Sequence, residues 1–127
     1  KVFKPMQVYG QSKLANILFT KSLAEKLSEH DVTVNCLHPG FVSTGIGSNN
    51  NKALWTFLMF LAKPFARKTD KGAETSIYLC CSPEVENLSG EYFVDCKVEK
   101  VSAAAKSSEQ AAKLWQISTD ITGLKLY

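Results

Sequence analysis

A tyrosine and a lysine four positions apart, Tyr9 and Lys13, are the residues whose types and spacing best suit chemistry. An apolar helical pattern continues from Leu14 to Phe19, and side chains at i and i+4 share one helix face. A phenol ordinarily has a pKa near ~10, and a nearby cation favours the phenolate and lowers that pKa. The pair therefore indicates an acid/base unit for a carbonyl or an alcohol. From spacing alone, an exposed lysine beside a half-buried tyrosine is the more common arrangement.

A helix and a buried strand are the elements that must position this pair. The apolar periodicity predicts a helix over 7–29, and the apolar run 32–37, interrupted by Asn35, predicts a strand buried on both faces of a parallel sheet. His38-Pro39-Gly40 follows at the carboxyl end of that strand, where open α/β sheets place their sites. Pro39 lacks a backbone donor and Gly40 permits the close approach of a ligand, although an ordinary strand-ending turn has the same composition.

The remaining chain predicts one more helix–strand unit and a terminal helix. A helix begins near Thr69 or Asp70, either of which can cap it, and ends before Ser82-Pro83. The run 91–94 predicts the last strand of the sheet, and 109–121 predicts an amphipathic helix. The residues expected to pack in this half are Ile77, Tyr78, Leu79, Ala112, Trp115 and Ile121.

Five motifs follow one another along the chain: Tyr9-Gly-Gln-Ser-Lys-Leu-Ala-Asn16, His38-Pro-Gly40, Lys71-Gly-Ala-Glu-Thr75, Ser89-Gly-Glu-Tyr-Phe93 and Asp95-Cys-Lys97. In this order they resemble the carboxyl-terminal half of the short-chain dehydrogenase/reductase family, and within it the retinol-dehydrogenase-like branch. The resemblance covers essentially the whole chain and implies an α/β fold: part of a Rossmann-like, doubly wound parallel sheet in three layers, α/β/α. Residues 1–127 would be the carboxyl-terminal part of a single domain, with the family's sixth and seventh strands.

The resemblance implies hydride transfer between a nicotinamide cofactor and a carbonyl or alcohol. Tyr9 would be the catalytic acid/base, and Lys13 would lower its pKa and hold the nicotinamide ribose. The Val42 backbone would contact the carboxamide, and Thr44 would reach the amide or the phosphates. NADP(H) is favoured over NAD(H). The cofactor-binding residues implied are Tyr9, Lys13, Pro39, Gly40, Val42 and Thr44.

The strongly apolar segment 53–66 admits three interpretations: a core helix, a membrane-surface element flanked by basic residues, or the family's substrate lid. It is too short to cross a membrane, which takes ~20 apolar residues. Its position after the Pro-Gly turn favours a lid over 48–68, and an apolar lid implies an apolar substrate such as a retinoid, a lipid aldehyde or a steroid. The lid residues are Leu54, Trp55, Phe57, Leu58, Phe60 and Leu61.

Three parts of the family pattern are missing from these 127 residues: the glycine-rich phosphate loop, the asparagine of the central strand and the catalytic serine that precedes the tyrosine. We therefore expect the piece alone to be inactive and to belong to a longer enzyme. The alternative is an inactive or truncated segment that acts by pairing with a partner subunit, as the tyrosine-bearing helix does in many relatives.

Composition fits one globular unit, with 45% hydrophobic and 21% charged residues. A net charge of +3, spread along the chain, does not indicate nucleic-acid binding. None of the four cysteines forms a C-x-x-C pair, so we predict no metal site and buried, reduced thiols.

The expected partners are an apolar small molecule, a second subunit in a homodimer and a peripheral membrane contact. A cytoplasmic location is predicted, with membrane association at the endoplasmic reticulum as the alternative.

Overall fold

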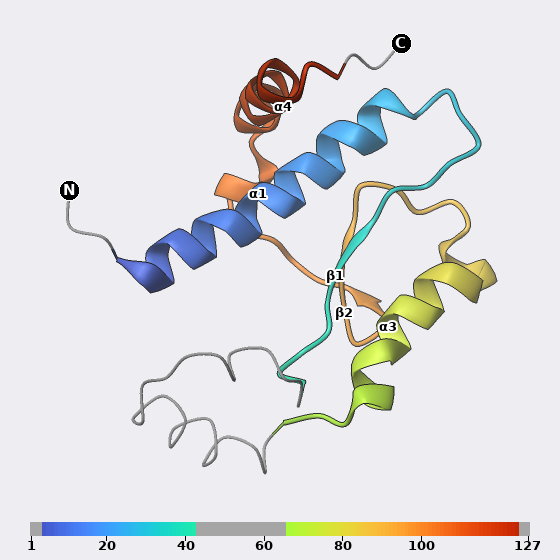
Figure 1. Cartoon of the computed structure of the whole chain (residues 1–127). Helices are drawn as coiled ribbons and strands as arrows, with labels where there is room; N and C mark the ends of the chain where they lie inside the picture. The colour runs from blue at the N-terminus through green and yellow to red at the C-terminus, as the bar shows by residue number, and fades with distance from the viewer. Residues whose placement is uncertain (1–3, 43–65, 125–127) are drawn as a thin grey trace.

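The computed structural model describes residues 4–42 and 66–124, which form a short sheet between two helices (Figure 1). Helix α1 lies on one side of the sheet and α3 on the other, and α4 packs against α1 on the side away from the sheet (Figure 1). Thr44 and the lid residues from Leu54 to Leu61 lie outside the described residues. The elements are α1 (Pro5–Lys26), β1 (Cys36–His38), α3 (Thr69–Cys81), η2 (Pro83–Val85), β2 (Tyr92–Val94), β3 (Lys97–Val98), η3 (Ala104–Lys106) and α4 (Ser108–Thr122).

Helix α1 begins at Pro5, whose fixed φ suits the first helical turn, and it ends three residues before the predicted boundary. It buries Leu18, Thr20 and Ser22, and the Thr20 hydroxyl donates to the Asn16 carbonyl at 3.0 Å. Aromatic stacking joins α1 to α4, since the ring centroids of Phe19 and Trp115 lie 5.4 Å apart. The sequence prediction of one long helix here is confirmed.

Helix α4 has a clear cap at each end. The Ser107 hydroxyl accepts a hydrogen bond from the Gln110 N–H at 3.2 Å, and Gly123 ends the helix in the left-handed conformation with φ +68°. The buried residue on this helix is Ala111. The predicted burial of Ala112 and Ile121 is wrong, because the helix turns these two side chains toward solvent.

The sheet has the order β1-β2-β3, with β1 and β2 parallel and β2 and β3 antiparallel. The parallel pair confirms the predicted α/β architecture, and Leu37 lies opposite Phe93. Two predictions about the strands were wrong: 91–94 is followed by β3, and the strand expected over 32–37 covers only Cys36–His38. Because β1 is an edge of the described sheet, its side chains are half-exposed rather than buried on both faces.

Among the residues that the structure describes, Phe93 of β2 is the largest side chain that is fully buried, with 1% of its surface exposed. It packs near Tyr78 of α3, at a centroid distance of 6.4 Å, and Val85 of η2 is also buried. Ile77 was expected to pack on the sheet but is 60% exposed, since it lies on the outer side of α3. The expected cap at Thr69 or Asp70 is also wrong, because the N-cap residue of α3 is Lys68, without a side-chain bond.

The cysteines are less buried than predicted. Cys80 and Cys81, at the carboxyl end of α3, are exposed, while Cys36 and Cys96 are half-buried. Burial raises the pKa of the Cys36 thiol. All four are free thiols.

Asn35, which interrupts the apolar run, connects the chain before β1 to the turn before β2. Its Nδ2 donates to the Leu88 carbonyl at 2.7 Å, and its Oδ1 accepts from the Glu91 N–H at 3.0 Å. Gly90 N–H donates to the Val34 carbonyl at 2.7 Å beside them. The side chain thus sets the register in which β1 and β2 pair.

Asn35→Ala is expected to lower the free energy of unfolding by about 1–3 kcal/mol, since it leaves two backbone groups without these partners. Urea unfolding of the full-length protein that carries this chain would measure the loss. Asn87→Ala, at an exposed asparagine of the same turn, serves as the control. Equal stability of the two variants would contradict the role assigned to Asn35.

Candidate active site

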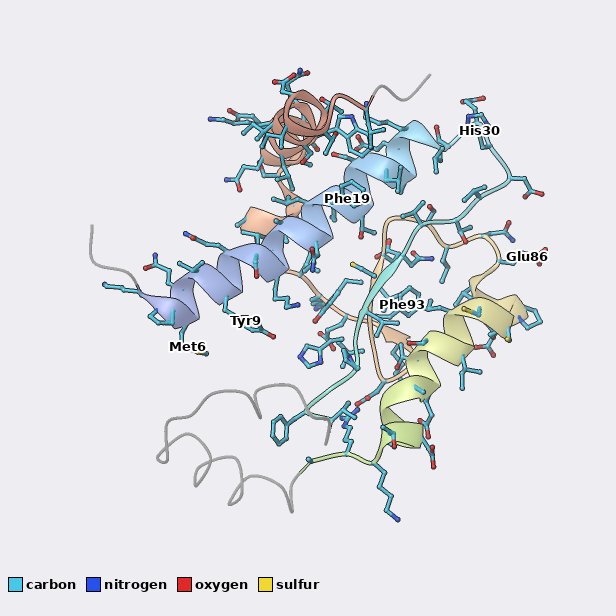
Figure 2. The ribbon with its side chains drawn as sticks, in the orientation of Figure 1. Met6, Tyr9, Phe19, His30, Glu86 and Phe93 are labelled. Carbon is cyan, nitrogen blue, oxygen red and sulfur yellow. The ribbon has the colours of Figure 1, made fainter. Side chains whose placement is uncertain are left out.

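Tyr9 and Lys13 lie together on α1, as the sequence predicts. The Lys13 ammonium nitrogen is 5.3 Å from the centroid of the Tyr9 ring, and Tyr9 is 59% exposed. The helix positions the pair, since each residue lies well inside its 22 residues. In Figure 2, Tyr9 projects from α1 toward the side of the molecule on which β1 ends. A phenol and an ammonium are therefore both open to a ligand on that side.

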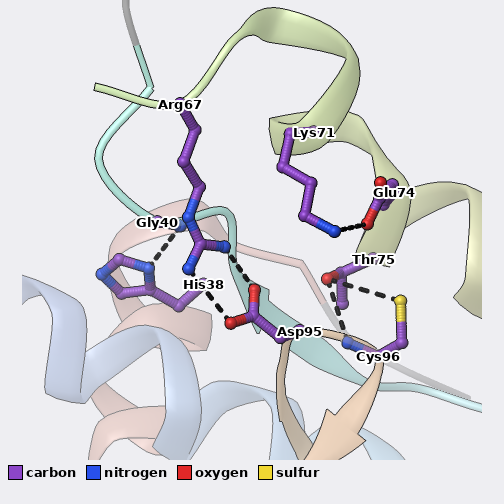
Figure 3. Close-up of polar contacts among 8 residues, drawn as sticks. All are labelled: His38, Gly40, Arg67, Lys71, Glu74, Thr75, Asp95 and Cys96. Atoms are coloured by element: carbon purple, nitrogen blue, oxygen red, sulfur yellow. Dashed lines mark hydrogen bonds and ion pairs between the residues drawn. The ribbon is translucent and has the colours of Figure 1, made fainter. Parts of the chain in front are cut away.

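The loop after β1 is the second part of the site. Its first turn is closed by the Gly40 N–H, which donates to the Nδ1 of His38 at 2.7 Å (Figure 3). Gly40 has φ +80°, a conformation that favours glycine. The space that a Cβ at Gly40 would fill is taken by Arg67, whose Nε would lie 2.8 Å away. On the side of its missing Cβ, the glycine therefore admits the Arg67 side chain, and contact of its backbone with a ligand stays a prediction.

Arg67 fastens this loop to the rest of the fold. Its backbone N–H donates to the Phe41 carbonyl at 2.7 Å, and a parallel β-bridge joins it to Val42. Its guanidinium forms two hydrogen bonds with the Asp95 carboxylate, the Nη2–Oδ2 bond being 3.0 Å (Figure 3). Hydrogen bonding to Arg67 holds the pKa of Asp95 below its usual value, and hydrogen bonding to Asp95 raises the pKa of Arg67.

Helix α3 supports the loop and the β2–β3 turn from one side. Val42 packs against Gly72, where a Cβ would come within 2.6 Å of a Val42 methyl carbon. The Cys96 N–H donates to the Thr75 hydroxyl at 3.2 Å. Asp95 and Cys96 both have positive φ, 51° and 61°, so the turn that presents the Asp95 carboxylate is tight. Gly72 and Thr75 are thus needed for close packing, which explains why both are buried.

The predicted site residues form two separate groups in the structure. Tyr9 and Lys13 meet on α1, and Pro39, Gly40 and Val42 form the loop after β1. Within residues 4–42 and 66–124, no hydrogen bond or ion pair joins one group to the other.

Sequence reasoning missed the role of Arg67 and Asp95. In the sequence, Arg67 is one of the basic residues that flank the apolar segment 53–66, and Asp95 occurs only as the first residue of the motif Asp95-Cys-Lys97. The two residues are 28 positions apart, and no spacing rule connects residues so distant.

The chain is similar in sequence to known proteins over most of its length. A family model described as short chain dehydrogenase matches residues 2–55, which include Tyr9, Lys13 and the loop after β1. Retinol dehydrogenase 14 of Mus musculus is 47% identical over 118 residues, which are 91% of this chain and 35% of that protein. Retinol dehydrogenase 12 of Mus musculus is 41% identical over 117 residues, 92% of this chain and 36% of that protein. The WW domain-containing oxidoreductase of Pongo abelii is 40% identical over 115 residues, 89% of this chain and 27% of that protein.

The chain belongs to the short-chain dehydrogenase/reductase family, a family of oxidoreductases. Within that family it is retinol dehydrogenase-like, and it spans about a third of the length of the retinol dehydrogenases that it matches. Among the residues that the structure describes, no helix is both long enough and apolar enough to cross a membrane.

Proposed function

We propose that this chain forms the catalytic part of a nicotinamide-dependent oxidoreductase that interconverts an apolar carbonyl compound and its alcohol. The observation that carries the proposal is the exposed phenol of Tyr9 with the Lys13 ammonium 5.3 Å from its ring. Membership of an oxidoreductase family supports it. The chain spans about a third of its relatives, so the activity is proposed for a longer protein that contains it.

Tyr9 is proposed as the general acid in reduction and the general base in oxidation. In reduction the substrate oxygen gains negative charge, and a hydroxyl that donates its proton there stabilises the transition state. Lys13 keeps a positive charge beside the phenolate that remains, which favours it electrostatically. In oxidation the same phenolate accepts the proton from the alcohol. The proton thus moves at the Tyr9 hydroxyl oxygen in both directions.

The cofactor proposed is NADP(H) in preference to NAD(H), and it would supply or accept the hydride. The donor set on α1 fits it, since an ammonium with three N–H donors suits the hydroxyls of a ribose. We assign Lys13 to the ribose, and the backbone from Pro39 to Val42, with Thr44, to the nicotinamide side. Supporting this assignment, the loop follows the carboxyl end of a parallel strand, where open α/β sheets bind nucleotides.

The substrate class proposed is long and apolar, such as a retinoid, a lipid aldehyde or a steroid. It rests on the composition of the segment from Leu54 to Leu61, which offers dispersion and desolvation but few hydrogen bonds. Burying apolar area contributes roughly 25 cal/mol per Å², whereas a sugar or a 2-hydroxy acid would lose water without gaining partners. A cytoplasmic or membrane-associated location stays a prediction.

A panel of aldehydes of rising chain length, assayed with the full-length enzyme and NADPH or NADH, tests this proposal. We expect kcat/KM to rise with chain length, by up to about fifteenfold for every two methylenes that become buried, at about 0.8 kcal/mol each. NADPH should give the higher kcat/KM. Trp55→Ala combined with Phe57→Ala should flatten the dependence on chain length, while Ile121→Ala on the exposed face of α4 should not change it. A flat profile in the unmodified enzyme would contradict the lid.

A pairing module without activity is the second candidate, and exposed apolar residues on α1 favour it. Met6 is 76% exposed on the same helix as Tyr9, and Val8 is exposed beside it. A second copy of the protein is the partner proposed, as a homodimer. Sedimentation of wild type and Met6→Glu would test it: a dimer that dissociates in the variant, in a protein without reductase activity, would favour pairing alone.

A further inference from the structure

Three segments far apart in the sequence meet at the Arg67 side chain. The first is the loop Pro39–Val42, the second is the chain entering α3, and the third is the turn between β2 and β3 (Figure 3). Arg67 contacts the loop through both its backbone and its side chain, and it contacts the turn through its guanidinium. The loop is also supported by the contact of Val42 with Gly72 and by the hydrogen bond from the Gly40 N–H to the Nδ1 of His38.

We propose that the Arg67–Asp95 ion pair is a positioning device that fixes the Gly40–Val42 backbone in the conformation that receives the nicotinamide. This inference rests on the function proposed above. Arg67 and Asp95 act through the loop and are positioning residues, not catalytic ones.

The contact between Arg67 and Gly40 explains how the pair acts on the loop. The end of the Arg67 side chain lies where a Cβ of residue 40 would be, with its Cδ and the guanidinium atoms Nε and Cζ all within 3.0 Å of that point. Asp95 holds the guanidinium by two parallel hydrogen bonds, a geometry that fixes its plane as well as its position. The guanidinium therefore packs against one side of the loop. Without Asp95 it would be free to move, and the loop would lose this contact.

The Arg67–Asp95 pair is too exposed to contribute much to the free energy of unfolding. The side chains of Arg67 and Asp95 keep 34% and 52% of their surface exposed, and ion pairs with such exposure contribute little to the free energy of unfolding. The expected effect is therefore local, on the loop and on what binds there. A neighbouring ion pair on α3 also joins a basic side chain to an acidic one, with the Lys71 Nζ 2.6 Å from the Glu74 Oε2. It provides a matched control.

The experiment compares Arg67→Met, Asp95→Asn and the double variant in the full-length enzyme, with Lys71→Met as the control. Asparagine tolerates positive φ, so Asp95→Asn removes the charge and keeps the turn. NADPH affinity is measured by fluorescence titration, and hydrogen exchange of segment 38–42 is measured without cofactor.

Each single variant should raise the Kd for NADPH about two- to fivefold, the range that a coupling of this kind supports. The double variant should be no weaker than the weaker single one, because both changes break the same pair. Exchange should quicken in 38–42 in these variants, with kcat at saturating NADPH and the thermal midpoint no more altered than in Lys71→Met. Arg67→Lys, which keeps the charge but not the two parallel bonds, should give an intermediate Kd.

Unchanged Kd and unchanged exchange in Arg67→Met, in an enzyme whose wild type binds NADPH, would overturn the inference alone. Additive losses in the double variant would also overturn it, since the residues would then act separately. A wild-type enzyme that binds neither NADPH nor NADH would overturn the proposed function, and this inference with it.

Discussion

Replacing Tyr9 with phenylalanine is expected to lower turnover about 10²–10⁴-fold, the usual contribution of a positioned acid/base group. The substitution removes one hydroxyl from a side chain that is 59% exposed on α1, so the fold should not change. The Kd for NADPH should stay nearly constant, because the proton donor acts on the substrate oxygen. Steady-state turnover of a long-chain aldehyde and a fluorescence titration of NADPH give the two quantities.

Two further variants make this experiment decisive. Lys13→Ala should lower both turnover and NADPH affinity, since the ammonium is assigned to the phenolate and to the ribose. Tyr78→Phe is the matched control. The hydroxyl of Tyr78, a residue of α3, donates to the Glu84 carboxylate at 2.8 Å, and losing this hydroxyl should leave turnover unchanged. Near wild-type turnover in Tyr9→Phe would show that Tyr9 is not the general acid and that another group donates the proton.

Truncating Phe93 to alanine is expected to lower the free energy of unfolding by about 3–5 kcal/mol, the range for a large aromatic residue in a core. Phe93 lies on β2, the central strand, and only 1% of it is exposed. Such a loss approaches the whole stability of a marginal domain, so soluble yield should fall as well. Urea unfolding of the full-length protein measures the change.

Val98→Ala on the neighbouring strand β3 is the control for Phe93. Half of Val98 is exposed, and the substitution should change the free energy of unfolding by no more than about 0.5 kcal/mol. If Phe93→Ala unfolded at the same urea concentration as Val98→Ala, then the core of this chain would lie elsewhere than at β2.

The sequence by itself determined the features that depend on local spacing. The four-residue step between Tyr9 and Lys13, inside an uninterrupted helical pattern, was enough to predict that the two side chains would meet. The order of helix and strand likewise predicted the parallel pairing of β1 and β2. The first prediction succeeded because helical periodicity acts within a few residues. The second succeeded because the order of helices and strands along the chain restricts how distant strands can pair.

Burial was harder to predict, because it depends on which neighbours a face has. Ile77 has the composition of a core residue and yet faces solvent, since α3 packs on the sheet with its other side. The strand before His38 is apolar and yet half-exposed, since β1 is an edge of the described sheet. An apolar residue shows its preference for burial, but only the packed neighbours decide whether that preference is met.

Only the tertiary structure decided the polar contacts between distant segments. In the sequence, Asn35 is only a polar residue within an apolar run. In the fold, its side chain forms hydrogen bonds with the backbone of Leu88 and Glu91, which lie more than 50 residues away. Arg67 and Asp95 meet because the tight turn at Asp95 lies beside the entrance of α3. A hydrogen bond requires its two groups to lie within about 3 Å, and no pattern along the chain specifies that distance before the chain has folded.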